Sequence, residues 1–126
     1  MSIDAEKWAS SLKIAAIGNK QIKGFVKGLQ KYVKTVERID AYEYGEKALF
    51  ERIRAVDYVY VCIDSVPHHV TNFLKSEIEL MEKTEFFYRP SIDDGVTRVN
   101  YLYWLQEGKR VEIKKNKKYV LDKKQM

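Results

Sequence analysis

One short segment limits what this chain can fold into more than any other feature of its sequence. Residues 58–63 (YVYVCI) are almost all β-branched, aromatic or cysteine, with no alternation between apolar and polar positions. A strand that is apolar on both faces is typical of the centre of a parallel sheet with helices above and below it. The segment therefore predicts an α/β domain with residues 58–63 as an inner strand.

The rest of the chain alternates between short apolar runs and helical patterns. Residues 12–17, 36–41 and 85–88 predict three further strands, and the apolar spacing of residues 20–33, 46–56, 67–83 and 96–106 predicts the helices. Parallel strands joined by helices require right-handed crossovers. The predicted fold class is a Rossmann-like three-layer α/β sandwich with a four-stranded, mostly parallel sheet of order 2-1-3-4.

The length of 126 residues suits one domain. We expect residues 1–108 to form the α/β domain and residues 109–126 to form a basic C-terminal hairpin or tail of the same domain. The one cysteine, Cys62, excludes a disulfide within the chain and argues against a Cys-based zinc site. A cytoplasmic location is expected, because the sequence shows no signal-peptide pattern and no apolar run long enough to span a bilayer.

The predicted topology also indicates where a ligand would bind. In an open parallel sheet, ligands lie beyond the carboxyl ends of the strands, where the strand order reverses, which here is between the first and third strands. Free N–H groups at the start of the helix after Pro67, together with the charge of Lys20, favour a phosphate, a carboxylate or a nucleotide. The predicted ligand-binding residues leave the strands at this edge: Gly18, Asn19, Lys20, Asp64, Ser65, His68, Arg89 and Ser91.

Several of these residues also have a structural interpretation. Gly18 lacks the further glycines of a dinucleotide fingerprint or a P-loop, so a plain tight turn is the simpler role and no cofactor is predicted. Asp64 or Ser65 can cap the following helix, and Asp93 and Asp94 can cap the last helix.

Metal binding and nucleophilic catalysis are not predicted. Adjacent histidines on a helix, His68 and His69, point about 100° apart, so they cannot easily share one metal ion. Cys62 lies within the inner strand and is expected to be a small buried hydrophobe. We therefore assign no catalytic residue and no metal ligand from the sequence.

Three stretches of the chain resemble a bacterial Rossmann-like family catalogued as domain of unknown function 2325. They are residues 13–18 (KIAAIG), 55–68 (AVDYVYVCIDSVPH) and 86–91 (FFYRPS), and the similarity spans residues 12–105. Asp64, Val66 and His68 match the family's Asp-x-Val-Ser-His motif. Ser65 and Pro67 depart from the family's usual residues, and Asn19 stands where a second glycine is usual. The resemblance implies the fold and the location of the site, and no activity.

A weaker similarity concerns residues 17–25 (IGNKQIKGF). They are similar to the start of the small central-stalk F subunit of V-type ATPases, which implies a structural partner protein without catalysis.

The positive charge of the chain is concentrated at its C-terminal end. Residues 109–126 contain eight basic and two acidic residues, whereas residues 1–108 contain 15 basic and 16 acidic ones. A nucleic-acid backbone would be bound by Lys109, Arg110, Lys114, Lys115, Lys117 and Lys118, with Tyr119 stacking on a base. The alternatives are a solvated hairpin whose lysines deter edge-to-edge aggregation and a contact with an anionic partner protein.

Three hypotheses of function remain open, since a fold alone does not specify a function. The first is a small non-enzymatic regulatory or adaptor module, from a phage or mobile element, that binds a small anionic ligand or a partner protein at the carboxyl edge of the sheet. The second is a nucleic-acid-binding accessory protein that acts through the basic C-terminal segment. The third is a nucleotide-processing hydrolase that uses Asp64 and His68.

Overall fold

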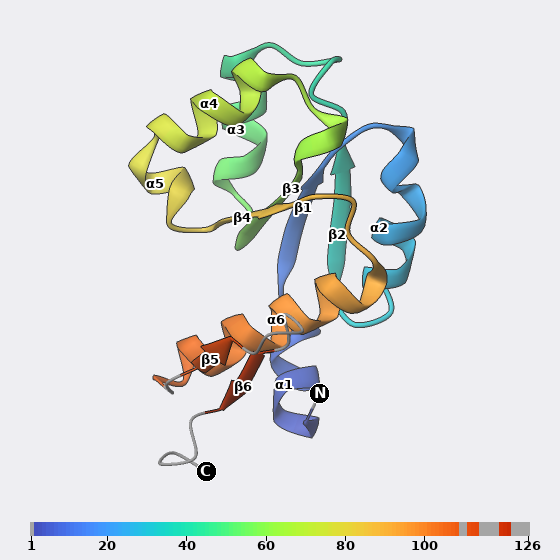
Figure 1. Ribbon diagram of the computed structural model, residues 1–126, viewed down its shortest axis with the longest axis vertical. Helices are drawn as coiled ribbons and strands as arrows, with labels where there is room; N and C mark the ends of the chain where they lie inside the picture. Colours follow the sequence, from blue (N-terminus) through green and yellow to red (C-terminus); the bar gives the residue numbers. More distant parts are fainter. Residues whose placement is uncertain (1, 109–110, 114–118, 122–126) are drawn as a thin grey trace.

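A computed structural model of the chain describes residues 2–108, 111–113 and 119–121. Its main sheet consists of β1 (Lys13–Ile17), β2 (Thr35–Ile39), β3 (Tyr58–Cys62) and β4 (Thr84–Phe87), in the order β2-β1-β3-β4 (Figure 1). All neighbouring strands in this sheet run parallel, and Ile14 of β1 stands opposite both Val36 and Tyr58. The predicted fold class and strand order are therefore confirmed.

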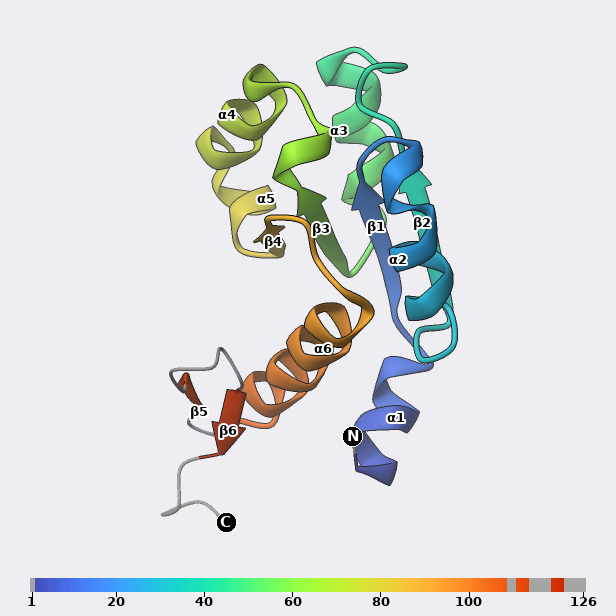
Figure 2. The same cartoon turned by 45° about the vertical axis from the view of Figure 1, so that its right-hand side comes forward.

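Helices cover both faces of this sheet (Figure 1 and Figure 2). α1 (Ile3–Ala9), α2 (Lys23–Leu29) and α6 (Ile92–Gln106) pack on one side, and α3 (Glu46–Arg54), α4 (His68–Ser76) and the short α5 (Ile78–Met81) pack on the other. Successive strand side chains point to opposite faces. In β1, Ile14 and Ala16 accordingly join the first apolar cluster, and Ala15 and Ile17 join the second.

The inner strand β3 is buried along almost its whole length. Val59, Tyr60, Val61 and Cys62 are each 0% exposed. The Tyr60 ring centroid lies 4.9 Å from that of Phe87, within the range of favourable aromatic pairs. Because helical layers cover both faces, no position of this strand needs to be polar, which explains why residues 58–63 show no alternation.

Side chains from neighbouring elements satisfy the backbone at the amino end of β3. Asp57 Oδ2 accepts a hydrogen bond from the backbone N–H of Lys13 at 2.8 Å. Lys83 Nζ donates to three carbonyl oxygens where α3 ends, those of Ile53 (2.8 Å), Arg54 (3.1 Å) and Val56 (2.8 Å). Burial lowers the pKa of the Lys83 ammonium, and the nearby Asp57 opposes this shift. One lysine thus joins the amino end of β4 to the C-terminus of α3.

The C-terminal end forms a second, smaller sheet. β5 (Val111–Ile113) and β6 (Tyr119–Leu121) pair antiparallel and lie beside α6 (Figure 2), which confirms the predicted hairpin in its two strands. Of the predicted nucleic-acid-binding residues, only the backbone of Tyr119 is described. Lys109, Arg110, Lys114, Lys115, Lys117 and Lys118 lie outside the described residues. Within the described part of the chain, no helix is long and apolar enough to cross a membrane.

Three of the differences from the sequence predictions concern α1, the helix predicted for residues 67–83 and α6. The sequence patterns did not predict α1, whose N-cap Ser2 accepts a hydrogen bond from Ala5. The helix predicted for residues 67–83 is broken at Glu77, where the backbone is extended, and Met81, beyond the break, is exposed instead of buried. α6 begins four residues earlier than predicted, because Ser91 caps it.

Candidate functional site

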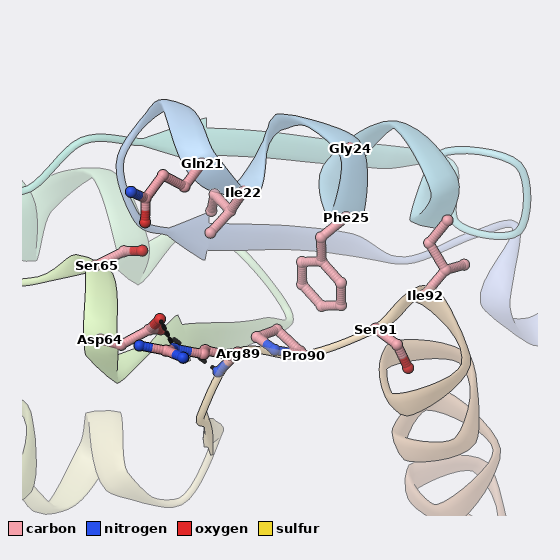
Figure 3. A pocket seen from close by; sticks show the side chains of 10 residues that line it. All are labelled: Gln21, Ile22, Gly24, Phe25, Asp64, Ser65, Arg89, Pro90, Ser91 and Ile92. Atoms are coloured by element: carbon pink, nitrogen blue, oxygen red, sulfur yellow. Dashed lines mark hydrogen bonds and ion pairs between the residues drawn. The ribbon is translucent and has the colours of Figure 1, made fainter.

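A cavity of about 750 Å³ opens beyond the carboxyl ends of the strands, and we call it the first cavity (Figure 3). One wall comes from the 3₁₀ turn η1 (Lys20–Ile22) and from α2, and another from the 3₁₀ turn η2 (Ile63–Ser65) that follows β3. The loop after β4 and the start of α6 close the third side. Its lining residues are Gln21, Ile22, Gly24, Phe25, Asp64, Ser65, Arg89, Pro90, Ser91 and Ile92.

An ion pair between Asp64 and Arg89 borders this cavity. Arg89 Nε lies 3.3 Å from Asp64 Oδ2, and the backbone N–H of Arg89 donates to Asp64 Oδ1 at 3.4 Å. The side chain of Asp64 is 19% exposed, whereas that of Arg89 is 75% exposed. Such an exposed pair contributes about 0–1 kcal/mol to stability, so its main effect is to orient the guanidinium.

The backbone of Arg89 is itself unusual. Its φ of +46° lies in the left-handed region, which costs a non-glycine residue about 1–3 kcal/mol. The guanidinium carbon of Arg89 lies 5.3 Å from the centroid of the Tyr88 ring, within the range of a cation–π contact. The chain thus accepts a strained residue at the point where the guanidinium meets the cavity.

The prediction that Asp64 or Ser65 caps the next helix is wrong. The N-cap of α4 is Pro67, and no side chain caps this helix by a hydrogen bond. The η2 turn and the extended Val66 (φ −133°, ψ 152°) separate Asp64 from the helix start. This separation leaves the carboxylate of Asp64 free to accept from Arg89, while Ser65 is buried in the cavity wall.

Ser91 lines the first cavity and also has a structural role. Its Oγ accepts from the N–H of Asp94 at 3.1 Å, and Asp94 Oδ2 accepts from the N–H of Ser91 at 2.8 Å, which together form a capping box. The predicted cap by Asp93 or Asp94 is therefore corrected: Ser91 is the cap and Asp94 its reciprocal partner. The carboxylates of Asp93 and Asp94 in the first turn offset the positive helix end, so α6 attracts anions only weakly.

Gly18, Asn19 and Lys20 lie near this edge but are not among the lining residues of the first cavity. Gly18 donates its N–H to the carbonyl of Ile39 at 3.0 Å, and a Cβ on it would come within 2.7 Å of Ile22. Asn19 Oδ1 accepts from the N–H of Gln21 at 2.8 Å and caps η1. The turn therefore uses Gly18 and Asn19 to build its own structure, and Lys20 is exposed.

A second cavity, of about 520 Å³, lies on the other side of Asp64, and His68 belongs to it. Its lining residues are Ile63, Asp64, Val66, His68, Thr71, Asn72, Lys75, Phe86 and Tyr88. The predicted ligand-binding residues are therefore divided. Asp64, Ser65, Arg89 and Ser91 surround the first cavity, His68 lines the second, and Asp64 alone borders both.

The other titratable groups near β3 do not add to a reactive site. Burial, with a smaller effect of Asp64, raises the pKa of the Cys62 thiol to about 12, so the group is a protonated thiol near neutral pH. No hydrogen bond joins Asp64 to His68 in the described part of the chain. Among the described residues, no three His, Cys, Asp or Glu side chains lie close enough together to hold a metal ion.

Sequence reasoning missed six of the residues that line the first cavity: Gln21, Ile22, Gly24, Phe25, Pro90 and Ile92. Four of them lie in residues 21–25, within eight residues of the end of β1, in the segment that the predicted topology already placed at this edge. Ile22 and Phe25 fit the apolar stripe of a helix, and the stripe gives no sign that part of it faces a cavity.

The chain matches no protein-family model, no curated protein and no solved structure with which it was compared. Its fold and geometry define a class: a Rossmann-like α/β domain with two cavities at the carboxyl edge of a parallel sheet. The resemblance to domain of unknown function 2325 stays a prediction.

Proposed function

We propose that this protein is a small regulatory or adaptor module, not an enzyme, that holds a small anionic ligand in the first cavity. The observation that carries the proposal is the guanidinium of Arg89, oriented by Asp64 at the border of a cavity at the carboxyl edge of the sheet. This edge is where open parallel sheets bind their ligands.

Arg89 can supply the anion contact. Asp64 occupies its Nε, and its two Nη groups make no hydrogen bond within the described residues. A guanidinium binds a carboxylate or a phosphate through two parallel N–H donors, and these charge-assisted bonds are roughly twice as strong as neutral ones. A guanidinium already fixed by Asp64 loses less side-chain entropy when such a ligand binds.

The rest of the lining limits what the anion can be. Among the described residues, the charged ones that line the first cavity are Asp64 and Arg89, and their charges cancel. Affinity must therefore come from oriented hydrogen bonds and from apolar contact. Phe25, Pro90 and the exposed Ile92 supply an apolar wall, so the ligand we favour carries a carboxylate or phosphate on an apolar body.

One feature favours binding over catalysis. Asp64 and His68 both line the second cavity, but Asp64 pairs with Arg89 and makes no hydrogen bond to His68 within the described residues. A histidine that acts as a general base is oriented by a hydrogen bond to a further group, and Asp64 does not supply it. The hydrolase hypothesis is therefore the weaker one.

The remaining hypotheses stay predictions. Nucleic-acid binding depends on lysines outside the described residues. An origin in a phage or mobile element, a partner protein and a cytoplasmic location likewise rest on the sequence.

Binding of small anions to the purified chain tests the proposal. The probes are a set of aliphatic and aromatic carboxylates and phosphate monoesters, followed by thermal shift and by isothermal titration calorimetry. We expect Arg89→Gln to weaken binding about tenfold or more, because a charge-assisted hydrogen bond is worth about 1.5–3 kcal/mol. Arg54→Gln is the matched control, since Arg54 is an exposed arginine of α3.

A steric variant gives an independent arm. Gly24 lines the first cavity, and a Cβ on it would meet no atom within 4 Å, so a side chain there occupies open space. Gly24→Trp should block the ligand, whereas Gly24→Ala should leave binding intact. The proposal is wrong if no probe binds at millimolar concentration, or if a probe binds equally to wild type, Arg89→Gln and Gly24→Trp.

A further inference from the structure

The second cavity has a wall that the sequence of α4 explains. His68, Thr71, Asn72 and Lys75 follow the spacing i, i+3, i+4 and i+7, which places them on one face of the helix. The other face of α4 buries Val70 and Leu74 in the core. The four polar residues all line the second cavity, so a packed helix presents them as a row.

Another part of the lining is aromatic. Phe86 and Tyr88 alternate along β4 and the residue beyond it, so both side chains point to the face of the sheet that α4 covers. The side chain of Phe86 is half-buried against the core, whereas Tyr88 is 66% exposed. Ile63 and Val66 complete the apolar part of the lining. The lining of the second cavity thus combines aromatic side chains with a row of polar ones.

The polar row is available to a ligand. The side chains of His68, Thr71 and Asn72 make no hydrogen bond within the described residues, and the contact found for Lys75 is its ammonium 5.3 Å from the Phe86 ring centroid. Asn72 and Thr71 can each donate and accept, and Lys75 can donate three hydrogen bonds. This combination fits the polar edge of a planar heterocycle whose faces contact the aromatic side chains.

The charges around the second cavity favour a ligand that is also anionic. Lys75 contributes a full positive charge, and Asp64 is the acid among the lining residues. The carboxylate of Asp64 is already compensated by Arg89 at 3.3 Å. A phosphate group would therefore find Lys75 without facing an uncompensated carboxylate.

We propose that the second cavity is a binding site for a nucleoside monophosphate, separate from the first cavity. The base contacts Phe86 and Tyr88 and is read at its edge by Asn72 and Thr71, and the phosphate pairs with Lys75. Its volume of about 520 Å³ lies within the usual range for small-molecule sites, about 300–1,000 Å³. The inference does not depend on the proposed function, because the two cavities share only Asp64.

The test uses the full chain and three kinds of probe: the four common ribonucleoside 5′-monophosphates, the matching nucleosides and inorganic phosphate. Titration is followed by calorimetry and by amide chemical shifts. We expect at least one nucleotide to bind saturably, its nucleoside to bind about tenfold more weakly, and inorganic phosphate to bind more weakly still. Shifted amides should cluster at His68, Thr71, Asn72 and Lys75.

Variants locate the site and separate it from the first cavity. Tyr88→Ala should weaken nucleotide binding about tenfold, because it removes an aromatic side chain on which the base stacks. Asn72→Ala should weaken it several-fold, because the edge of the base loses its hydrogen bonds to the amide. Lys75→Gln should remove the preference for nucleotide over nucleoside, and the matched control Lys47→Gln, at an exposed lysine of α3, should not. Gly24→Trp should leave nucleotide binding unchanged.

Three results would overturn the inference: no nucleotide binds at millimolar concentration, binding is unchanged in both Tyr88→Ala and Asn72→Ala, or Gly24→Trp abolishes binding while those two variants do not affect it. The last result would place the nucleotide in the first cavity, and so support the proposed function while refuting the second site. If an alanine variant fails to fold, the chemical-shift map of the wild-type chain decides alone.

Discussion

The two ends of the inner strand β3 differ in what their polar groups contact. At the amino end, protein groups satisfy one another: Asp57 accepts from Lys13, and Lys83 donates to the carbonyl groups where α3 ends. At the carboxyl end, Asp64 borders two cavities, and the largely exposed Arg89 lines the first of them. The difference indicates that polar groups at the amino end stabilise the fold, whereas those at the carboxyl end are open to solvent. Mutations should therefore separate stability from the proposed binding.

The largest expected effect concerns the amino end. Lys83→Met removes the donor from three carbonyl groups and should lower the free energy of unfolding by about 2–3 kcal/mol, since hydrogen bonds to charged groups are the stronger ones. Chemical denaturation measures this loss, and Lys47→Met at an exposed site should change stability by less than about 0.5 kcal/mol. Anion binding should be unaffected. A large loss of anion affinity in Lys83→Met would show that stability and anion binding do not depend on separate ends of β3.

The next prediction concerns Cys62, the buried residue at the carboxyl end of β3, and the dependence of stability on pH. Burial raises the pKa of the Cys62 thiol from 9.0 to about 12, so above pH 9 the unfolded chain loses this proton while the folded chain keeps it. The stabilising contribution is complete below pH 9 and is lost as the pH rises toward 12, by up to about 1.4 kcal/mol per pH unit. Denaturant unfolding at pH 8 and pH 10.5 should show an extra loss of about 2 kcal/mol in wild type relative to Cys62→Ala. Equal losses in both proteins would mean that the Cys62 thiol is accessible to solvent in the folded protein.

A smaller effect is expected at Arg89. Arg89→Ala keeps the left-handed backbone and loses the guanidinium, whereas Arg89→Gly loses the guanidinium and relieves the strain of φ +46°. Arg89→Gly should therefore be more stable than Arg89→Ala by about 1 kcal/mol, and both should lose anion binding. Thermal unfolding and calorimetry of the two variants measure this. If Arg89→Gly is the less stable of the two, the left-handed backbone at this position does not destabilise the fold.

The smallest effect is expected at Gly24, in the first turn of α2. Gly24→Ala should raise the free energy of unfolding by about 0.5 kcal/mol, because alanine loses less backbone entropy in a helix and the added Cβ meets no atom within 4 Å. Affinity for the anion should stay the same. Destabilisation would show that the wall of the first cavity is more tightly packed than its open space indicates.

Much of the fold could be predicted because it depends on patterns that are local in the sequence. The unbroken apolar run at residues 58–63 requires two covered faces, and alternation with helices then leads to parallel strands. That topology brings the residues after each strand to one edge, so Asp64, Ser65, Arg89 and Ser91 were correctly expected near one another. No information about their side chains was needed for this step.

The details of the site could not be predicted because they depend on which partner each side chain finds in space. Asp64 was expected to cap the next helix, but its carboxylate instead pairs with Arg89, 25 residues away in the chain. His68 was expected in one site with Asp64, Arg89 and Ser91, but the η2 turn and Val66 place it on α4, where it lines the second cavity and not the first. The hydrophobic stripe of α2 likewise gives no sign that Phe25 meets a cavity as well as the core.

Because the carboxylate of Asp64 borders both cavities, the occupancy of one cavity can change the affinity of the other. An anion in the first cavity that draws the guanidinium of Arg89 toward itself leaves the carboxylate of Asp64 uncompensated. That carboxylate also borders the second cavity, where it then repels a second anion. Two negatively charged guests would then antagonise each other without touching, and by thermodynamic reciprocity each would weaken the other by the same factor.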